Sequence, residues 1–127
     1  MSGGVLVLAA TPIGDPRDAA PRLADELRVA DVVAAEDTRR LRRLCQDLDV
    51  NPTGRVVSYH EHNEAERTPD LVERLREGAR VLVVTDATAS RRGILDALIA
   101  CARQVGARSR RRRAHRESEQ RTRASSS

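Results

Sequence analysis

Apolar residues in the first 87 positions gather in short continuous runs separated by amphipathic stretches. The runs carry little polar alternation, which is typical of strands buried on both faces of a parallel sheet. Four such runs lie at residues 5–9, 31–35, 55–59 and 80–86. Apolar residues at helical spacing occupy the stretches between them, at residues 19–30, 38–48 and 69–78. This alternation of strand and helix predicts an α/β fold with a mostly parallel sheet.

The bounds of the third predicted helix depend on two residues. Pro69 suits the first turn of a helix, where its missing N–H is not needed, and Gly78 suits the position just past the end. We therefore expect this helix to begin at Pro69.

Polar and titratable residues follow the carboxyl ends of all four predicted strands. In a parallel sheet these ends share one edge, and ligands bind in the crevice outside it. The four loops expected at this edge are residues 11–15, 36–39, 58–64 and 86–87. The sequence therefore places the functional site there.

The loop after the first strand contains a turn-forming sequence with a glycine. It reads Pro12, Ile13, Gly14 and Asp15. Gly14 allows a phosphate or nucleoside to approach the backbone closely, and a helix follows, but the same sequence suits an ordinary tight turn. It is neither a dinucleotide-binding glycine motif nor a P-loop. Both interpretations stay open.

A group of four polar residues links the second strand to the next helix. They are Glu36, Asp37, Thr38 and Arg39. Asp37 or Thr38 can cap the helix by accepting hydrogen bonds from its first N–H groups. Carboxylates at this place in nucleotide-binding sheets also hold ribose hydroxyls. The residues alone do not decide between capping and binding.

The densest polar cluster follows the third strand. It reads His60, Glu61, His62, Asn63 and Glu64. Two histidines at i and i+2 do not share a helical face, and the spacing is not that of a zinc-binding His-Glu-x-x-His helix. Surface imidazoles near a helix N-terminus are therefore favoured over a metal site.

Taken in order and at their separations, these loops resemble one known family. The stretches that carry the resemblance are residues 9–15, 34–39, 58–64 and 83–87. They resemble the ribosomal RNA small subunit methyltransferase I family, within the tetrapyrrole methylase-like superfamily of S-adenosylmethionine-dependent enzymes. The resemblance covers residues 4–87 and implies a truncated, parallel-sheet N-terminal half-domain of that fold.

The resemblance implies an activity and its partners. The family transfers a methyl group from S-adenosylmethionine to the 2′-hydroxyl of a cytidine in 16S ribosomal RNA of the small ribosomal subunit. It acts in the cytoplasm as a homodimer and does not associate with a membrane. It holds the donor in a cleft between two α/β domains. By position, donor-binding residues are Pro12, Ile13, Gly14, Asp15, Asp86 and Ala87.

The resemblance also implies residues that face the RNA or the donor. They are Glu36, Asp37, Thr38, Arg39, His60 and Asn63. Shedding the hydroxyl proton calls for a general base, for which His60, Glu36 and Asp37 are the candidates, and no metal is implied. Because more than half of the family's length is missing, we expect this chain to be inactive by itself.

Charge divides the chain near residue 88. Residues 1–87 carry 12 Arg and 16 acidic residues, a balance of −4, whereas residues 88–127 carry 11 Arg and 3 acidic residues, a balance of +8. Thr88 and Ala89 also stand where the family continues with a Gly-Thr-Pro-Gly-like turn. We therefore expect an incomplete methyltransferase domain at residues 4–87 and a non-homologous, mostly disordered basic tail at residues 88–127.

Three explanations of the tail stay open. An RNA-binding arm would attract phosphates in a salt-dependent, sequence-blind way, and gives the alternative function of a small RNA-binding protein. Solvated disorder also fits the composition, although residues 94–105 have helical spacing. We favour a shifted reading frame of GC-rich DNA, because all 23 basic residues are Arg. RNA-binding domains that stack bases need aromatic side chains, and the one aromatic residue of this chain is Tyr59, so that class of RNA-binding domain is not favoured.

Overall fold

A parallel β-sheet forms the centre of the protein in the computed structural model, which describes residues 4–11, 21–60, 62–86 and 92–112. In chain order the elements are β1 (Val5–Thr11), α1 (Pro21–Val29), β2 (Val32–Ala35), α2 (Thr38–Asp47), β3 (Arg55–Ser58), α3 (Glu64–Arg76), β4 (Arg80–Asp86), α4 (Arg92–Gln104) and β5 (Arg108–Arg112). The five strands lie in the order β3-β2-β4-β1-β5, and every pairing is parallel.

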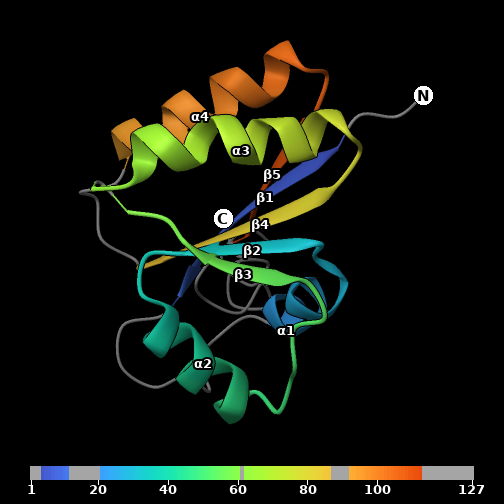
Figure 1. The fold of residues 1–127 in the computed structure, drawn as a ribbon. Coiled ribbons are helices and arrows are strands. Elements are labelled where there is room, and N and C mark those ends of the chain that lie inside the picture. The colour runs from blue at the N-terminus through green and yellow to red at the C-terminus, as the bar shows by residue number, and fades with distance from the viewer. Residues whose placement is uncertain (1–3, 12–20, 61, 87–91, 113–127) are drawn as a thin grey trace, which may run out of the picture.

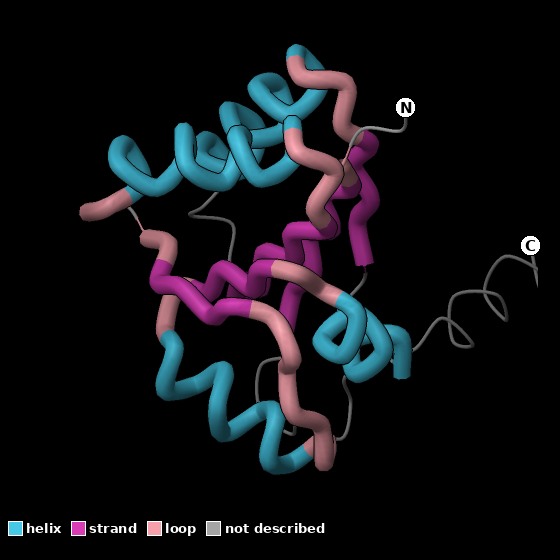
Figure 2. The backbone as a smooth tube through the Cα atoms, turned by 45° about the vertical axis from the view of Figure 1, so that its right-hand side comes forward, coloured by secondary structure: helices cyan, strands magenta, loops and turns pink. Residues whose placement is uncertain are grey.

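Helices cover both faces of the sheet. The helices α1 and α2 lie on one side and α3 and α4 on the other (Figure 1), and Figure 2 shows the same three layers from a second direction. Side chains alternate between the faces along each strand. Val7 and Ala9 of β1 join the core beneath α1 and α2, whereas Leu6 and Leu8 join the core beneath α3 and α4. Burial on both faces explains the continuous apolar runs, and confirms the predicted α/β fold.

The helix α3 begins earlier than the sequence pattern predicts. It starts at Glu64 and contains Pro69 in its interior, so the expected start at Pro69 is wrong. Pro69 cannot donate to the carbonyl of Ala65, four residues before it. Both residues are exposed, so water can reach that carbonyl and the helix continues.

The segment after residue 91 differs from the expected disorder. Residues 92–104 form α4, whose Leu98 and Ala102 are buried in the same core as α3. The following strand β5 pairs with β1, while its Arg108 and Arg110 stay exposed. An edge strand tolerates arginines because only its backbone must join the sheet. The expected boundary between 87 and 88 stays a prediction, and residues 113–127 lie outside the described residues.

A buried ion pair ties α1 to the start of β4. The guanidinium of Arg80 donates to both carboxylate oxygens of Glu26 at 2.9 Å, with a further bond from Nε to Oε2 at 3.1 Å. The side chain of Glu26 is only 7% exposed and that of Arg80 28%. The backbone N–H of Arg80 also donates to Asp31 Oδ2 at 2.8 Å. These bonds fix the amino ends of the strands.

Within the described residues, none of the helices has the length and apolar character needed to cross a membrane.

Replacing Arg80 with Ala should lower the free energy of unfolding by about 3 kcal/mol, because the carboxylate of Glu26 is left buried without this partner. Urea unfolding followed by far-ultraviolet circular dichroism measures the loss. Arg76→Ala is the control: Arg76 lies 3.8 Å from Glu73, both side chains are more than half exposed, and such pairs contribute less than about 1 kcal/mol. Equal losses in the two variants would contradict a structural role for the Glu26–Arg80 pair.

Candidate functional site

The order of the strands creates a topological switch point at the carboxyl edge of the sheet. β4 lies between β1 and β2. The chain leaves β1 and β2 toward the layer of α1 and α2, whereas it leaves β4 toward the opposite layer (Figure 1). Parallel sheets bind ligands in the crevice outside a point where neighbouring strands connect to opposite layers in this way. The functional edge predicted from the sequence therefore coincides with a topological switch point.

The donor-binding residues expected from the sequence are only partly within the described chain. Pro12, Ile13, Gly14, Asp15 and Ala87 lie outside the described residues. Asp86 is the last residue of β4, and it pairs in register with Thr11, the last residue of β1. The backbone thus ends these two strands at neighbouring positions on the carboxyl edge of the sheet.

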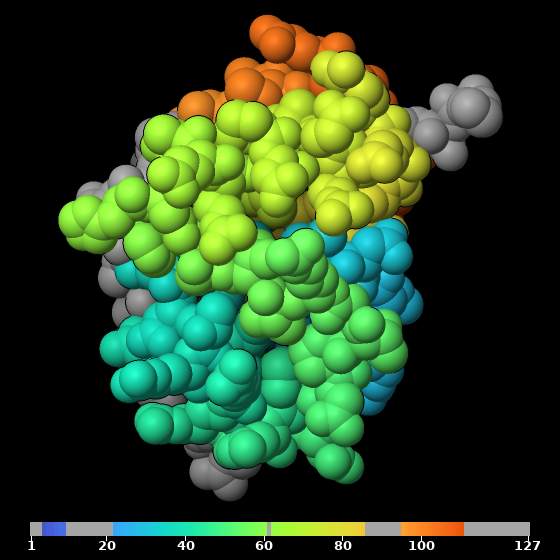
Figure 3. All heavy atoms as spheres, in the orientation of Figure 1, coloured from blue at the N-terminus to red at the C-terminus, as the bar shows by residue number. Residues whose placement is uncertain are grey.

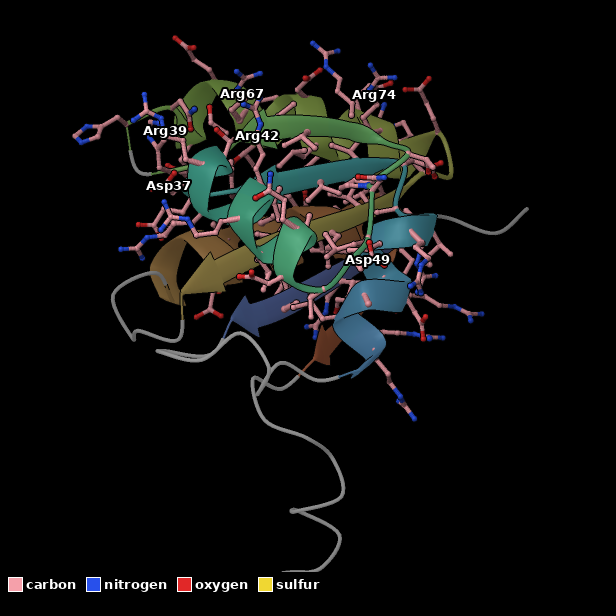
Figure 4. All side chains as sticks on the ribbon, turned by 90° about the horizontal axis from the view of Figure 1, so that it is seen from below. Asp37, Arg39, Arg42, Asp49, Arg67 and Arg74 are labelled. Carbon is pink, nitrogen blue, oxygen red and sulfur yellow. The ribbon has the colours of Figure 1, made fainter. Side chains whose placement is uncertain are left out.

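Asp37 caps α2, as one of the two interpretations of this motif predicts. Its backbone is extended, and its Oδ1 accepts hydrogen bonds from the N–H groups of Arg39 and Arg40 at 2.9 and 3.3 Å. Its Oδ2 lies 3.9 Å from Nε of Arg40. Figure 4 shows Asp37 at this end of α2 and Asp49 beyond the other. The capping bonds hold this carboxylate in place, so it is poorly suited to accept a substrate proton.

Glu36 occupies the position directly after β2. Its side chain is half-buried, and its Oε2 atom is buried. The preceding residue, Ala35, accepts a backbone hydrogen bond from Tyr59 at 2.8 Å, which joins the ends of β2 and β3. Glu36 therefore lies at the crevice edge with one carboxylate oxygen turned away from bulk solvent.

Asn63 organises the turn between β3 and α3. Its Oδ1 accepts from the backbone N–H of His60 at 2.9 Å, and its Nδ2 donates to the carbonyl and the hydroxyl of Ser58 at 3.2 and 3.1 Å. Its own carbonyl accepts from the N–H of Arg67 at 2.9 Å. These contacts use both ends of the amide within the turn. Asn63 therefore shapes the loop, and its expected contact with substrate stays a prediction.

His60 is held with one ring nitrogen occupied. Its Nδ1 accepts a hydrogen bond from the backbone N–H of His62 at 3.2 Å, and the two rings lie edge to face with centroids 5.7 Å apart. A neutral imidazole whose Nδ1 is an acceptor carries its proton on Nε2. In this arrangement the half-buried His60 ring offers a hydrogen-bond donor rather than a base. Among the described residues, His, Cys, Asp and Glu do not form a group of three that could hold a metal ion.

Tyr59 anchors the same loop to α3 through a hydrogen bond of its hydroxyl, a role that sequence reasoning missed. It is buried, and its hydroxyl lies 2.7 Å from the hydroxyl of Thr68. Burial raises the pKa of the Tyr59 hydroxyl, the hydrogen bond with Thr68 lowers it, and the charge of Glu64 raises it. A lone aromatic residue after a strand was the available signal, but nothing in the sequence pointed to Thr68 as its partner.

Comparisons with known proteins agree with this architecture. The family model for Tetrapyrrole (Corrin/Porphyrin) Methylases matches residues 5–88. A protein of Mycobacterium tuberculosis named ribosomal RNA small subunit methyltransferase I is 56% identical over 87 residues, which are 68% of this chain and 30% of that protein. The namesake of Escherichia coli is 37% identical over 86 residues, 68% of this chain and 29% of that protein. The chain thus spans less than a third of the length of these relatives.

One solved structure has a similar fold. It is a uroporphyrin-III-C-methyltransferase from Thermus thermophilus, with a TM-score of 0.61 and 22% sequence identity. The match covers 87% of this chain and 47% of that one. At this identity the likeness concerns the fold alone.

Replacing Asp37 with Ala should lower the free energy of unfolding by about 1 kcal/mol, because the N–H groups of Arg39 and Arg40 lose their acceptor. Urea unfolding gives the size of the effect, and amide hydrogen exchange at these two residues shows that it begins at the end of α2. Asp37→Ser keeps a capping oxygen and should retain most of the stability. If the Ser and Ala variants unfold alike, the cap does not contribute to stability.

Tyr59 should ionise above its ordinary pKa of 10.0 in the folded protein, because burial disfavours the phenolate. Tyr59 is the only tyrosine, so ultraviolet absorbance against pH reports it alone. The unfolded chain releases this proton first, so the stability that comes from the buried neutral hydroxyl is complete below pH 10.0 and falls as pH rises through the folded pKa. The chain in urea is the control, and an identical midpoint there would show that Tyr59 is not buried.

Proposed function

The chain belongs to the tetrapyrrole (corrin/porphyrin) methylase family, and from this premise we propose that it carries part of an S-adenosylmethionine-dependent ribosomal RNA methyltransferase site. The observation that carries the proposal is the 56% identity over 87 residues to a protein named for that activity. These 87 residues supply the strand ends that form the crevice. The acceptor we propose is the 2′-hydroxyl of a cytidine in 16S ribosomal RNA, modified in the cytoplasm by a homodimer on the small subunit.

The residues of the crevice fit the methyl donor. S-adenosylmethionine supplies a methyl group on a sulfonium, and it also carries an ammonium group and ribose hydroxyls. Hydrogen-bond acceptors and negative charge suit all of these groups. Asp86 ends β4 at the crevice, Thr11 pairs with it, and Glu36 follows β2. We assign the donor to the Asp86 side of the crevice, together with the loop at residues 12–15.

Hydrogen bonds within the loops disfavour two of the three candidate bases, Asp37 and His60. Asp37 is held as the cap of α2, and Nδ1 of His60 is occupied by the N–H of His62. Glu36 lies half-buried directly after β2, and from this position we assign it the proton of the acceptor hydroxyl. Nε2–H of His60 is suited to donate to an RNA oxygen and so to orient the ribose, since positioning supplies much of the rate in group transfer. Asp37 and Asn63 keep the two loops in shape around them.

The 127-residue polypeptide alone should bind the donor weakly and should not methylate 30S subunits, because it spans about 30% of the relatives' length and a donor cleft between two domains needs both walls. Saturation-transfer difference NMR detects weak binding and should show transfer to the adenosine protons of S-adenosylmethionine. Glu36→Gln should keep this signal if Glu36 faces the acceptor, and Asp86→Ala should weaken it severalfold.

The control for that experiment is Glu77→Gln, an exposed carboxylate just past the end of α3 and therefore at the amino edge of the sheet. It should leave the signal unchanged. Absence of transfer from the folded wild-type chain would overturn donor binding by these residues. Turnover of 30S subunits by the polypeptide alone would overturn its proposed inactivity.

For residues 88–127 we keep the proposal of a shifted reading frame, and sequencing genomic DNA through codons 80–100 tests it directly. The alternative function, a small RNA-binding protein with a basic arm, meets one structural difference. The arginines at 108–112 lie in β5, hydrogen-bonded to β1, and so do not form a free arm. Only the arginines beyond 112 are left to that alternative.

A further inference from the structure

Arginines cluster on the exposed face of α2. The buried stripe of this helix consists of Leu41, Leu44 and Cys45. On the opposite side, Arg39, Arg42 and Arg43 are all exposed. Arg39 stands three positions before Arg42 and four before Arg43, so it neighbours both on the helix surface, with about 5–6 Å between Cβ atoms. Figure 4 shows Arg39 and Arg42 along the helix.

This charge pattern opposes the stability of α2. The positive end of the helix dipole lies at the N-terminus, where acidic residues stabilise and basic residues do not. The helix α2 has no acidic residue in its first turn and no basic one in its last, and the carboxylate of Asp37 at the N-cap is the acidic group at its positive end. Like charges three or four positions apart add repulsion of about 0.2–0.5 kcal/mol per pair. An external anion would offset this repulsion among the arginines.

The other helices follow the opposite rule. Arg28 lies in the last turn of α1, Arg74 and Arg76 in the last turn of α3, and Arg103 in the last turn of α4. These positions suit a basic residue without any ligand. Arg22 and Arg92 also lie in first turns, of α1 and α4, so what distinguishes α2 is four arginines in ten residues with no basic residue in its last turn.

The cluster lies beside the crevice. Because α2 begins two residues after β2 ends, its first turn is at the carboxyl edge of the sheet. Figure 3 shows α2 at the lower left of this face, with its side chains forming the surface. Glu36, the proposed proton acceptor, is three residues before Arg39. A polyanion bound along these arginines would therefore run directly past the site of methyl transfer.

We propose that Arg39, Arg42 and Arg43 bind consecutive phosphates of the RNA strand and align it with the crevice; this rests on the proposed function, which makes RNA the substrate. A guanidinium binds phosphate through two parallel hydrogen bonds, which fits three arginines along one helix face. Arg40 is left out because it points toward Asp37, with Nε 3.9 Å from Oδ2. The contact is to phosphate, so it positions the strand without reading its sequence.

The test is RNA binding by the 127-residue chain, measured by fluorescence anisotropy with a labelled single-stranded oligouridine over a range of salt and without methyl donor. Arg39→Gln, Arg42→Gln and Arg43→Gln are combined in one variant. Log K falls as log salt rises, and loss of three phosphate contacts should make this negative slope shallower by about 2. Binding near 0.1 M salt should weaken about 100-fold. The melting temperature should stay the same or rise, because like charges are removed.

Two matched variants separate position from total charge. Arg74→Gln, Arg76→Gln and Arg103→Gln remove the same three charges from exposed positions in the opposite layer, and should change the slope by less than about 0.5. Arg113→Gln, Arg116→Gln and Arg121→Gln remove three charges from the sequence beyond β5 and test the alternative of a basic arm.

The proposal is supported if the α2 variant alone loses the salt-dependent affinity. Equal losses in all three variants would show that net charge attracts RNA, and would overturn it. Loss confined to the variant with substitutions beyond residue 112 would overturn it in favour of the basic arm, and absence of RNA binding by the wild-type chain would overturn it as well. Failure of donor binding with intact RNA binding would remove the proposed methyl transfer and leave the RNA surface in place.

Discussion

The insertion of β4 between β1 and β2 is the constraint on which the rest of the structure depends. Backbone groups buried between two helix layers must be paired within the sheet, and β4 provides partners for both neighbours. With β4 in this place, α1 and α2 build one helix layer and α3 and α4 build the other. Because β1 and β2 lead to one layer and β4 between them leads to the other, the switch point at the carboxyl edge is a consequence of the pairing order.

The two edges of the sheet are built differently. At the amino edge, a bidentate ion pair between Glu26 and Arg80 and the backbone bonds around Asp31 hold α1 against β4. At the carboxyl edge, short loops are shaped by side chains that bond to their own backbone, chiefly Asp37 and Asn63. Rigid packing at one edge allows polar, half-buried groups at the other. This division places Glu36 and His60 among the half-buried groups of the carboxyl edge.

Hydrogen-bond partners sort residues that the sequence places in one group. Glu36 and Asp37 are adjacent carboxylates, yet only Asp37 caps α2, because only its backbone lies at the N-cap with extended geometry. His60 and Asn63 share one motif, yet the amide of Asn63 is consumed by the turn while His60 keeps a donor nitrogen. Such distinctions depend on distances between backbone N–H groups and side chains, which residue types do not specify.

The sequence by itself determined the alternation of strands and helices and the apolar faces, and it indicated the edge where we propose the site, because these follow from local periodicity and from the loops after each strand. Its local signals misplaced the start of α3, since Pro69 resembles a first-turn proline and only the exposure of Ala65 makes it tolerable inside the helix. They also favoured disorder over residues 88–127, although the helical spacing at 94–105 indicated α4, because the charge of Arg108 and Arg110 conceals a backbone that β1 can pair. Tertiary structure alone decided the strand order, the Glu26–Arg80 and Tyr59–Thr68 contacts and the roles within each polar motif. Those depend on groups far apart in the chain, whose meeting no local pattern encodes.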